Sequence, residues 1–176
     1  MKNFEGWKIE IDFDSIRKIA FFNLSRNEPR YFTTKLNYVG QGISQILPLI
    51  TSSFFNHQKP ILTLIEEPEL HLHPSAHGDL AERFVESVKL NPNKNYLIET
   101  HSENFILRLR RLIAERKFDF SLADLSIYYI NYDEENNESN IEEVEILENG
   151  DVLNWPEGIF NESLEEVILL RKAQKN

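Results

Sequence analysis

The chain of 176 residues contains no cysteine. This absence excludes disulfide bonds, thiolate metal sites and cysteine nucleophiles, and because it fits a reducing compartment we expect a cytoplasmic protein. No uninterrupted apolar run approaches the about 18 residues that a transmembrane helix needs. The first 20 residues alternate charged and apolar side chains, unlike a signal peptide. A hydrophobic content of 41% without low-complexity segments predicts a globular protein with no membrane partner.

Basic side chains are missing from one long stretch. Between Phe118 and Leu170 there is no Lys or Arg, while 15 Asp or Glu occur there. So acidic a segment repels the phosphates of nucleic acids. A basic cluster precedes it, and we interpret this cluster as a solvated helix face; its members are Arg108, Arg110, Arg111, Arg116 and Lys117. The charge pattern therefore argues against direct nucleic-acid binding by this chain.

Glycine is also scarce, and its positions exclude one common motif. Only Gly6, Gly40 and Gly42 precede Ile43, and G-x-x-x-x-G-K-[ST] occurs nowhere in the sequence. That motif holds nucleotide phosphates between backbone N–H groups and a lysine. Residues 1–176 therefore contain no complete phosphate-binding loop of this type.

The most informative feature present is Ile61–Pro74, which reads ILTLIEEPELHLHP. Its first five residues form an apolar or β-branched run, which predicts a strand buried on both faces. The run leads into Glu66 and Glu67, and open α/β sheets bind ligands at the carboxyl ends of their strands. Two interpretations remain open from these residues alone. The strand simply ends at charged residues before a helix that begins at a proline, or one acid holds Mg²⁺ through water while the other orients an attacking water.

The other patterns alternate strands and helices and predict an α/β fold. Strands are expected at Trp7–Phe13, Lys18–Leu24, Tyr31–Leu36, Ile61–Ile65 and Asn95–Glu99, with a turn near Asn27–Pro29. Helices are expected at Ile43–Phe55, Pro74–Leu90 and Glu103–Lys117. Beyond Leu125 we predict antiparallel strands at Ser126–Tyr132 and Ile141–Leu147, a turn at Asn149–Gly150 and a helix at Leu164–Gln174. We accordingly divide the chain into domains 1–125 and 126–176.

Two further segments carry candidate site residues. In YVGQGIS, Gly40 and Gly42 allow a ligand to approach the backbone just before a helix, and Ser44 adds a hydroxyl. In IETHS, His101 follows the next short buried strand and could contact a phosphate oxygen or an attacking water. Taken singly, each segment also has an ordinary structural explanation, namely a capped helix start and a strand-end histidine bonded to a carbonyl.

Taken in order, the glycine turn, the strand ending in Glu-Glu-Pro-Glu and the strand ending in Thr-His-Ser resemble the C-terminal half of an ABC-type ATPase domain. In particular, ELHLHP and ETHSENFILRLRRL are similar to prokaryotic AAA-like ATPases related to the overcoming-lysogenisation-defect (OLD) nucleases. The tail LENGDVLNWPEGIFNESLEEVILLR resembles the small C-terminal domain of unknown function of one subfamily. The resemblance extends from Leu36 to Arg171 and implies a partial P-loop NTPase sheet with flanking helices, plus a small C-terminal hairpin and helix.

The resemblance also implies a nucleotide contact. Val39–Gln45 (VGQGISQ) matches the signature motif, which in such dimers contacts the γ-phosphate of the nucleotide held by the opposite subunit. The residues implied to bind ATP are Gly40, Gly42, Ser44 and Gln45, with Gly42 and Ser44 making the main contact.

The same resemblance implies the hydrolytic residues. Glu66 matches the Walker B acid that supports Mg²⁺, although Asp is more usual there. Glu67 matches the catalytic carboxylate that polarises the attacking water, and a Glu at this position favours hydrolysis over nucleotide sensing. His101 matches the switch histidine that pairs with the γ-phosphate. Leu70–Pro74 (LHLHP) matches the loop through which two subunits sense each other's sites.

Two other chemistries, a transition-metal site and a glycosidase pair, fit these residues less well. His71, His73 and His77 beside three glutamates suggest a transition-metal site, but their spacing fits no established pattern and their side chains would diverge on a loop entering a helix. A glycosidase pair is disfavoured because adjacent strand residues, here Glu66 and Glu67, point to opposite faces and cannot flank one bond.

The missing phosphate loop leads to two functional hypotheses. The first is the C-terminal part of a Mg²⁺-dependent ATPase, a homodimer or one completed by a Walker A half from elsewhere, that drives an effector protein in DNA maintenance or phage defence. The isolated chain is then expected to bind ATP poorly and to be inactive. The second is a truncated, non-catalytic interaction module that hydrolyses nothing.

Overall fold

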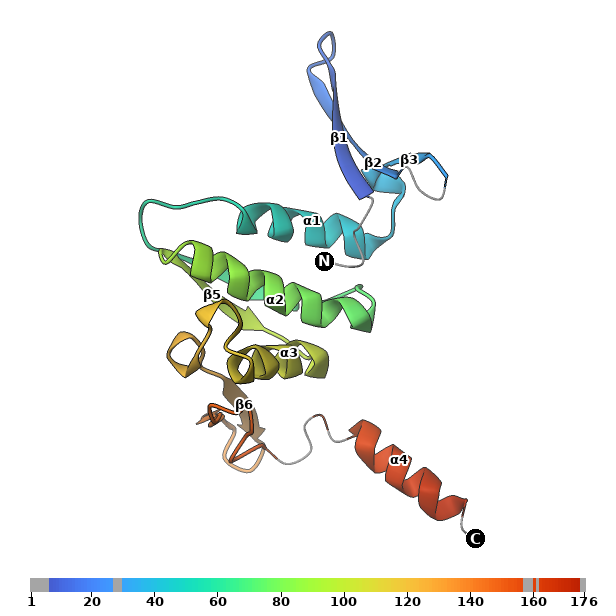
Figure 1. Ribbon diagram of the computed structural model, residues 1–176. Coiled ribbons are helices and arrows are strands. Elements are labelled where there is room, and N and C mark those ends of the chain that lie inside the picture. The colour runs from blue at the N-terminus through green and yellow to red at the C-terminus, as the bar shows by residue number, and fades with distance from the viewer. Residues whose placement is uncertain (1–6, 27–29, 157–159, 161, 175–176) are drawn as a thin grey trace. The chain divides into compact units, whose positions relative to one another are not determined.

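The computed structural model describes residues 7–26, 30–156, 160 and 162–174 (Figure 1). The turn predicted at Asn27–Pro29 lies outside these residues. Contacts divide the chain into one unit of residues 1–108 and a second of residues 109–176. This division falls inside a helix, whereas the sequence suggested a boundary after residue 125, which stays a prediction. The two units are described separately.

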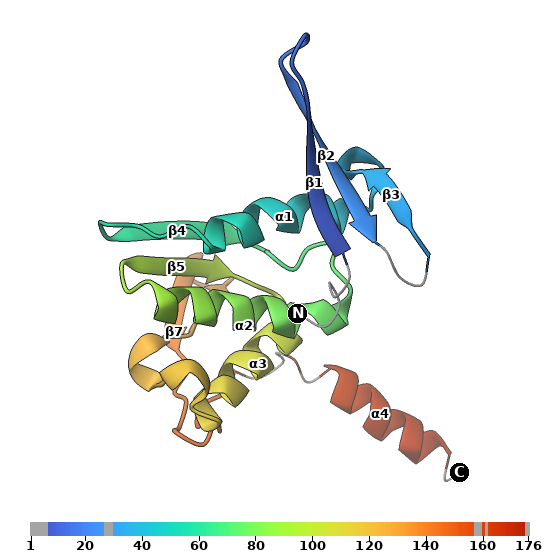
Figure 2. The same cartoon turned by 45° about the horizontal axis from the view of Figure 1, so that its top comes forward.

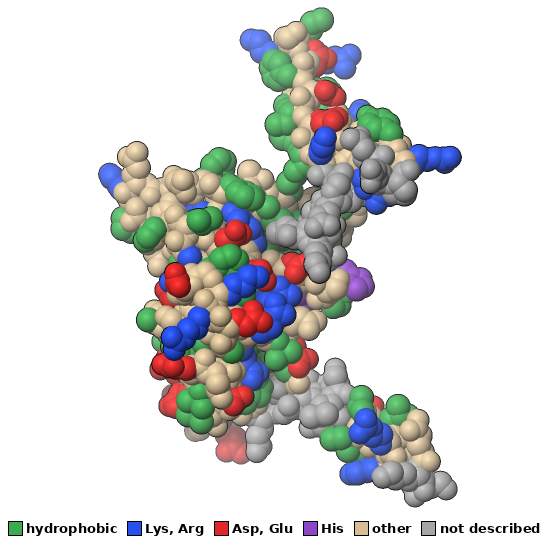
Figure 3. Space-filling model, in the orientation of Figure 1, with side chains coloured by type: hydrophobic (Ala, Val, Ile, Leu, Met, Phe, Trp, Pro, Cys, Tyr) green, Lys and Arg blue, Asp and Glu red, His purple; other side chains and the backbone are tan. Residues whose placement is uncertain are grey.

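The first unit begins with an antiparallel sheet. It contains β1 (Trp7–Asp14), β2 (Ile19–Arg26) and β3 (Phe32–Lys35) in that order, close to the strands predicted from the alternation of apolar and polar residues. Ile11 pairs with Phe22, and both side chains are exposed. Figure 3 shows hydrophobic side chains along this hairpin. One face of the hairpin is therefore apolar and uncovered.

A β–α–β segment follows. A short 3-10 helix (Leu36–Tyr38) leads into α1 (Gln41–Ser53), and then come β4 (Ile61–Glu66), α2 (Pro74–Leu90) and β5 (Lys94–Glu99). The bounds of α2 are those predicted, because Pro74 suits the first helical position and the apolar residues recur at helical spacing. Strands β4 and β5 pair in parallel from Ile61↔Lys94 to Glu66↔Glu99. Figure 2 shows the two strands side by side.

Helix α2 covers one face of this two-stranded sheet. The Phe84 ring lies 4.9 Å from Tyr96 on β5 and 6.3 Å from Phe105 at the start of the next helix, measured between ring centroids. The Ser87 and Tyr96 hydroxyls are 2.9 Å apart. The buried apolar side chains of the unit are Leu24, Ile46, Ile65, Leu80, Ala81, Phe84, Val85, Phe105 and Ile106. The core of this unit thus lies mainly between α2 and the sheet.

The prediction that β4 is buried on both faces was wrong. Leu62 and Leu64 are 59% and 69% exposed, and Leu97, which pairs with Leu64, is 61% exposed. The sheet has only two strands, and the residues that the structure describes cover only one of its faces. The apolar run of β4 therefore alternates between a covered and an uncovered face.

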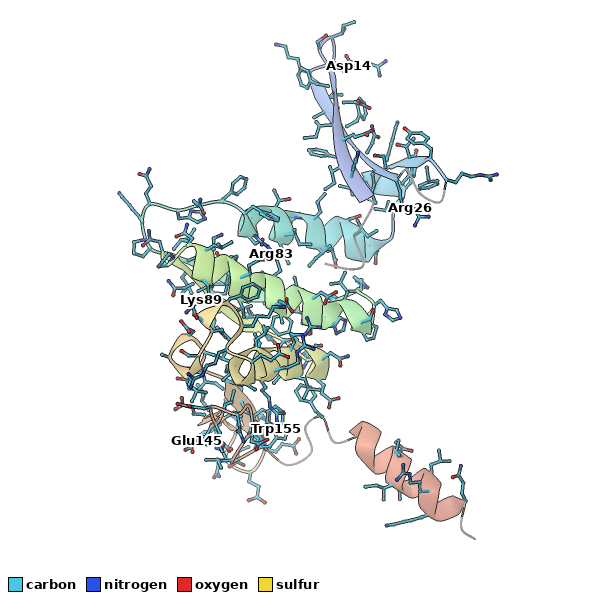
Figure 4. The ribbon with its side chains drawn as sticks, in the orientation of Figure 1. Asp14, Arg26, Arg83, Lys89, Glu145 and Trp155 are labelled. Carbon is cyan, nitrogen blue, oxygen red and sulfur yellow. The ribbon has the colours of Figure 1, made fainter. Side chains whose placement is uncertain are left out.

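The C-terminal end of α1 is held by two cations. Arg83 donates hydrogen bonds to the Ser53 hydroxyl (2.8 Å) and the Ser53 carbonyl (3.3 Å). Its guanidinium lies 3.8 Å from the centroid of the Phe54 ring, between α1 and α2 in Figure 4. The Lys94 ammonium donates to the same carbonyl at 2.7 Å, and burial lowers the pKa of Lys94, as does the neighbouring Arg83. Cations at this helix end complement the helix dipole.

Helix α3 (Glu103–Ala114) starts in the first unit and ends in the second, followed by 3-10 turns at Lys117–Asp119 and Leu122–Asp124. Its predicted apolar face is confirmed, since Phe105, Ile106, Leu109, Leu112 and Ile113 are all buried. Its predicted extension to Lys117 was wrong, because the helix ends at Ala114 and a turn leads to the 3-10 helix that begins at Lys117.

The second unit also contains an antiparallel hairpin and a last helix. The elements are β6 (Tyr128–Asp133), β7 (Glu138–Glu143) and α4 (Glu162–Ala173). Strand β7 starts three residues before the predicted Ile141–Leu147 strand, because the connecting turn is shorter than the polar loop suggested. The predicted turn at Asn149–Gly150 is present, with Gly150 at φ +83°. Within the described ranges, no helix combines the length and apolar character needed to cross a membrane.

Burial on the two faces of the β4–β5 sheet leads to a stability test. Phe84→Ala is expected to lower the free energy of unfolding by about 3–5 kcal/mol, because it empties the space between α2 and the sheet. Leu64→Ala, on the exposed face, is expected to change it by less than about 0.5 kcal/mol. Urea unfolding followed by circular dichroism measures both. Equal losses for the two variants would contradict the assigned faces.

Candidate functional site

The carboxyl ends of β4 and β5 bring the predicted hydrolytic residues together. The two strands end in register at Glu66 and Glu99, and the Glu67 N–H donates to the Glu99 carbonyl at 2.9 Å. This bond carries the pairing one residue beyond β4. The loop after β4 and the turn after β5 therefore begin at the same level of the sheet, where open α/β sheets bind ligands.

The side chains of Glu67 and His101 contact each other across this edge. The distance from His101 Nε2 to Glu67 Oε1 is 3.3 Å, and the two side chains are 76% and 39% exposed. Exposed pairs contribute little to stability, so this contact indicates placement more than stabilisation. Glu67 has φ +40°, a backbone conformation that residues other than glycine adopt at a cost in strain. An acid and an imidazole that share a solvent-exposed edge can bind and orient a water molecule beside the pair.

Glu66, the predicted metal-supporting acid, is exposed at the last residue of β4. Within the part of the chain that the structure describes, no three His, Asp or Glu side chains are grouped as a protein metal site needs. Mg²⁺ commonly takes only one or two protein carboxylates beside waters and phosphate oxygens. A single exposed glutamate can therefore contribute to such a site but cannot form one alone.

The start of α1 carries the predicted nucleotide-binding residues. Gly40 is the N-cap and its carbonyl accepts from Ile43 N (3.1 Å) and Ser44 N (3.4 Å). Ser44 and Gln45 are exposed on the first turn. A Cβ at Gly40 would have no atom within 4 Å, so the fold itself leaves this position open. The oriented N–H groups and dipole of a helix start favour an anion there.

Gly42 has a different role from Gly40. It is buried, and a Cβ there would lie 2.4 Å from the His71 carbonyl oxygen and 3.2 Å from Leu72 Cδ2. The helix start therefore contacts the loop that follows Glu67, and only glycine permits that approach. The structure thus brings the start of α1 against the Leu70–Pro74 loop, a contact that no local sequence pattern predicted.

Two supporting residues were missed by sequence reasoning. Glu69 is 7% exposed, and its Oε1 accepts hydrogen bonds from the Thr100 hydroxyl (2.6 Å) and His101 N (2.9 Å). His77, on the first turns of α2, lies 2.7 Å from the Ser102 hydroxyl and 3.3 Å from the Leu72 carbonyl. The run of acids and the histidine spacing marked both residues as unusual, but their partners Thr100, His101 and Ser102 lie 25 to 32 residues away in the sequence.

The three histidines that suggest a metal site lie at the start of α2 and in the loop before it. His73 is the N-cap of α2, where its Nδ1 accepts from Ser75 N at 3.2 Å. His77 bonds to other residues as described above, and His71 has φ +63° in the loop. The side chains of His73 and His77 are thus engaged in hydrogen bonds of the fold.

The basic cluster that precedes the acidic stretch forms contacts within the chain. The partners are Asp79 and Glu82 for Arg108, the Gly150 carbonyl for Arg110, Glu115 for Arg111, Glu148 for Arg116 and the Phe118 ring for Lys117. Acidic and basic side chains accordingly intermix over the α2 and α3 surfaces in Figure 3. Each cation of the cluster has a contact inside its own unit.

Comparison with known proteins bears on the family and the fold of the chain. A family model described as an AAA ATPase domain matches residues 2–106, and one described as a protein of unknown function (DUF3696) matches residues 122–169. None of the curated proteins compared with the chain matches it. A solved structure from work titled "Structural biochemistry of ATP-driven dimerization and DNA stimulated activation of SMC ATPases" is similar, with a TM-score of 0.59 and 11% identity. The similarity covers 93% of this chain and 82% of that chain, so the two differ little in length.

The fold is thus α/β, of the kind seen in ABC-type ATPases of the SMC class. Because the first family model covers more than half of the residues, the chain belongs to the family of AAA ATPase domains. This is a family of ATP-binding ATPases.

The two glycines of the α1 start allow a matched comparison. Gly42→Ser is expected to lower the free energy of unfolding by about 1–3 kcal/mol, because its Cβ would overlap the His71 carbonyl. Gly40→Ser is expected to have an effect within about 0.5 kcal/mol, since the position is open and serine is a good N-cap. Thermal and urea unfolding of both variants check this. A loss at Gly40 equal to that at Gly42 would show that the contact is misassigned.

Proposed function

We propose that this chain supplies the hydrolytic half of a Mg²⁺-dependent ABC-type ATPase related to the OLD-like proteins. The phosphate-binding loop would come from residues outside positions 1–176. The observation that carries the proposal is the Glu67–His101 pair, 3.3 Å apart at the carboxyl ends of two parallel strands. A strand-end acid facing an imidazole is an arrangement suited to placing an attacking water against a phosphate.

The proposed roles follow the geometry of the edge. Glu67 accepts a hydrogen bond from the attacking water and polarises it. His101, beside Glu67, donates to a γ-phosphate oxygen. Glu66 would hold Mg²⁺ through water. Mg²⁺, when bound with ATP, neutralises negative charge on the β- and γ-phosphates.

The residues present fit ATP and Mg²⁺ in part. Glu66 and Glu67 offer oxygen ligands and a water acceptor, and the open side of Gly40 leaves room for a phosphate beside the α1 start. The sequence lacks a loop with a lysine to hold the β- and γ-phosphates. The chain alone is therefore expected to bind ATP poorly and to hydrolyse none.

The uncovered face of the β4–β5 sheet supports the need for a complementing half. Parallel sheets occur almost only with both faces covered, yet Leu62, Leu64 and Leu97 are more than half exposed. The same face ends at Glu66, next to the proposed site. A complementing half that carries the phosphate loop would cover these leucines and bring the phosphates to the carboxyl ends of the strands.

The α1 start supports a dimeric arrangement. In the resemblance described above, this turn contacts the nucleotide of the opposite subunit, and here Gly40, Ser44 and Gln45 are exposed. The space beside the Gly42 Cα is taken up by the His71 carbonyl. The proposed phosphate contact therefore belongs to Gly40 and Ser44, and Gly42 has a packing role. The partner is a second copy or a complementing ATPase subunit, with an effector protein driven by the cycle. A role in DNA maintenance or phage defence rests on the resemblance to OLD-like proteins.

A non-catalytic interaction module is the second candidate. The observation that favours it is the apolar surface without a phosphate loop, found on the β4–β5 face and on the β1–β2 hairpin at Ile11 and Phe13. Such a module would dock on another protein and leave Glu67 unused. ATP turnover therefore separates the two candidates.

The deciding experiment adds a complementing half to the chain. Segments encoded next to this chain that carry G-x-x-x-x-G-K-[ST] are co-expressed with it, and release of phosphate from ATP is measured with and without Mg²⁺. Turnover that requires both components and Mg²⁺ supports the ATPase. A stable complex that neither binds nor hydrolyses ATP supports the interaction module instead.

Substitution of the proposed catalytic carboxylate gives the residue-level prediction. Glu67→Gln is expected to lower kcat of the complemented ATPase by about 100-fold or more, because the amide is a much poorer acceptor for a proton from water. ATP binding is expected to be retained. Glu142→Gln, at an exposed position of β7, is the matched control and should retain full activity. Undiminished turnover in Glu67→Gln would remove Glu67 from the mechanism.

A further inference from the structure

Glu69 is a nearly buried acid that the proposed mechanism leaves unused. Both of its hydrogen bonds are made by one oxygen, Oε1, which accepts from the Thr100 hydroxyl at 2.6 Å and from His101 N at 2.9 Å. The other oxygen, Oε2, is buried and has no hydrogen-bond partner among the residues that the structure describes. Burying a carboxylate in this way costs free energy. Only one oxygen of Glu69 is satisfied by hydrogen bonds, so burial of this carboxylate is not explained by stability alone. Its bond to the His101 backbone N–H suggests a role in the placement of His101.

Glu69 lies on the same loop as Glu67, two residues further on. Glu67 faces the imidazole of His101, while Glu69 faces the backbone N–H of the same residue. The loop is itself closed by two turns, in which Leu70 N donates to Glu67 O and Leu72 N donates to Glu69 O, both at 2.9 Å. One loop thus contacts both the imidazole and the backbone N–H of His101.

His77 ties the same two segments together a second time. A carbonyl only accepts, so the 3.3 Å contact with Leu72 O requires that His77 Nε2 carry the proton. In the neutral ring Nδ1 then accepts from the Ser102 hydroxyl at 2.7 Å. Ser102 Oγ in turn accepts from Phe105 N at 3.1 Å, at the start of α3. The loop after β4 is therefore bonded to the turn after β5 on both sides of His101.

We propose that Glu69 is a positioning residue that fixes the backbone of His101 so that its imidazole faces Glu67. His77 restrains the far side of the same turn. For its catalytic consequence this inference rests on the proposed ATPase function, whereas the geometric part concerns the chain alone. A displacement of the Leu70–Pro74 loop would move Glu69 and, through it, His101.

The geometric part is tested on the full chain without nucleotide. Amide hydrogen exchange of the ¹⁵N-labelled protein is followed by NMR for Glu69→Ala, Glu69→Asp and the matched control Glu142→Gln. Exchange at His101 N is expected to accelerate about ten-fold or more in Glu69→Ala, since the acceptor is removed. Glu69→Asp retains the charge but is one methylene shorter, and it is expected to lose the protection as well. It also serves if the alanine variant does not fold.

Selectivity decides the outcome. Faster exchange confined to residues 100–102, with the β5 amides of Asn95 and Leu97, which face β4 in the parallel ladder, unchanged, supports the positioning role. Unchanged exchange at His101 N, or equal acceleration throughout β5, overturns it, because Glu69 would then be absent from this contact or would only stabilise the fold.

The catalytic part uses the complemented ATPase. Glu69→Asp is expected to lower kcat about ten-fold or more while KM changes less than about two-fold, because the substrate still binds but His101 is misplaced. A variant with selective exchange at His101 and an unchanged kcat would overturn the link to catalysis. If the native assembly itself shows no turnover, the proposed function fails, while the exchange result still decides whether Glu69 positions His101.

Discussion

The parallel pairing of β4 with β5 is the constraint on which the rest of the site depends. Each strand has six residues, and all six pair in register, so both strands leave the sheet at one level. The bond from Glu67 N to Glu99 O extends that register into the loop. A slip by one residue would turn the core side chain Ile65 toward the uncovered face and would separate Glu67 from His101. The core between α2 and the sheet therefore fixes the site as well as the fold.

The sheet also divides the chain into an inward and an outward side. Phe84 and Tyr96 hold α2 on one face, whereas the leucines of the other face remain in contact with solvent. A domain that functions alone has its parallel strands covered on both faces, and an exposed apolar patch marks an interaction site. The retention of these leucines next to Glu66 is what a surface for a complementing subunit requires. The same short strands thus belong to the fold of this chain and to its proposed assembly.

Sequence reasoning reached the elements more easily than their contacts. Pro74 and the apolar spacing were sufficient for α2, and the five buried residues of α3 followed from the same period. The apolar run of β4 identified a strand but not its neighbours, so its second face was wrongly expected to be buried. Strand β7 reads ESNIEE, which has almost no apolar alternation to mark its limits. The partners of Glu69 and His77 and the approach of Gly42 to His71 depend on tertiary placement, which no local pattern contains.

The proposed catalytic pair, Glu67 and His101, and its supports differ in burial, and this difference has a physical reason. An exposed side-chain contact such as Glu67–His101 is too weak to hold its own geometry against solvent. Its placement must therefore come from the backbone on each side. Glu67 is placed by the extended strand register, and His101 by an acid that is almost fully buried. Buried hydrogen bonds are stronger and less exchangeable than exposed ones. The side chains that meet a substrate can then remain accessible while the backbone that carries them is held by the protein interior.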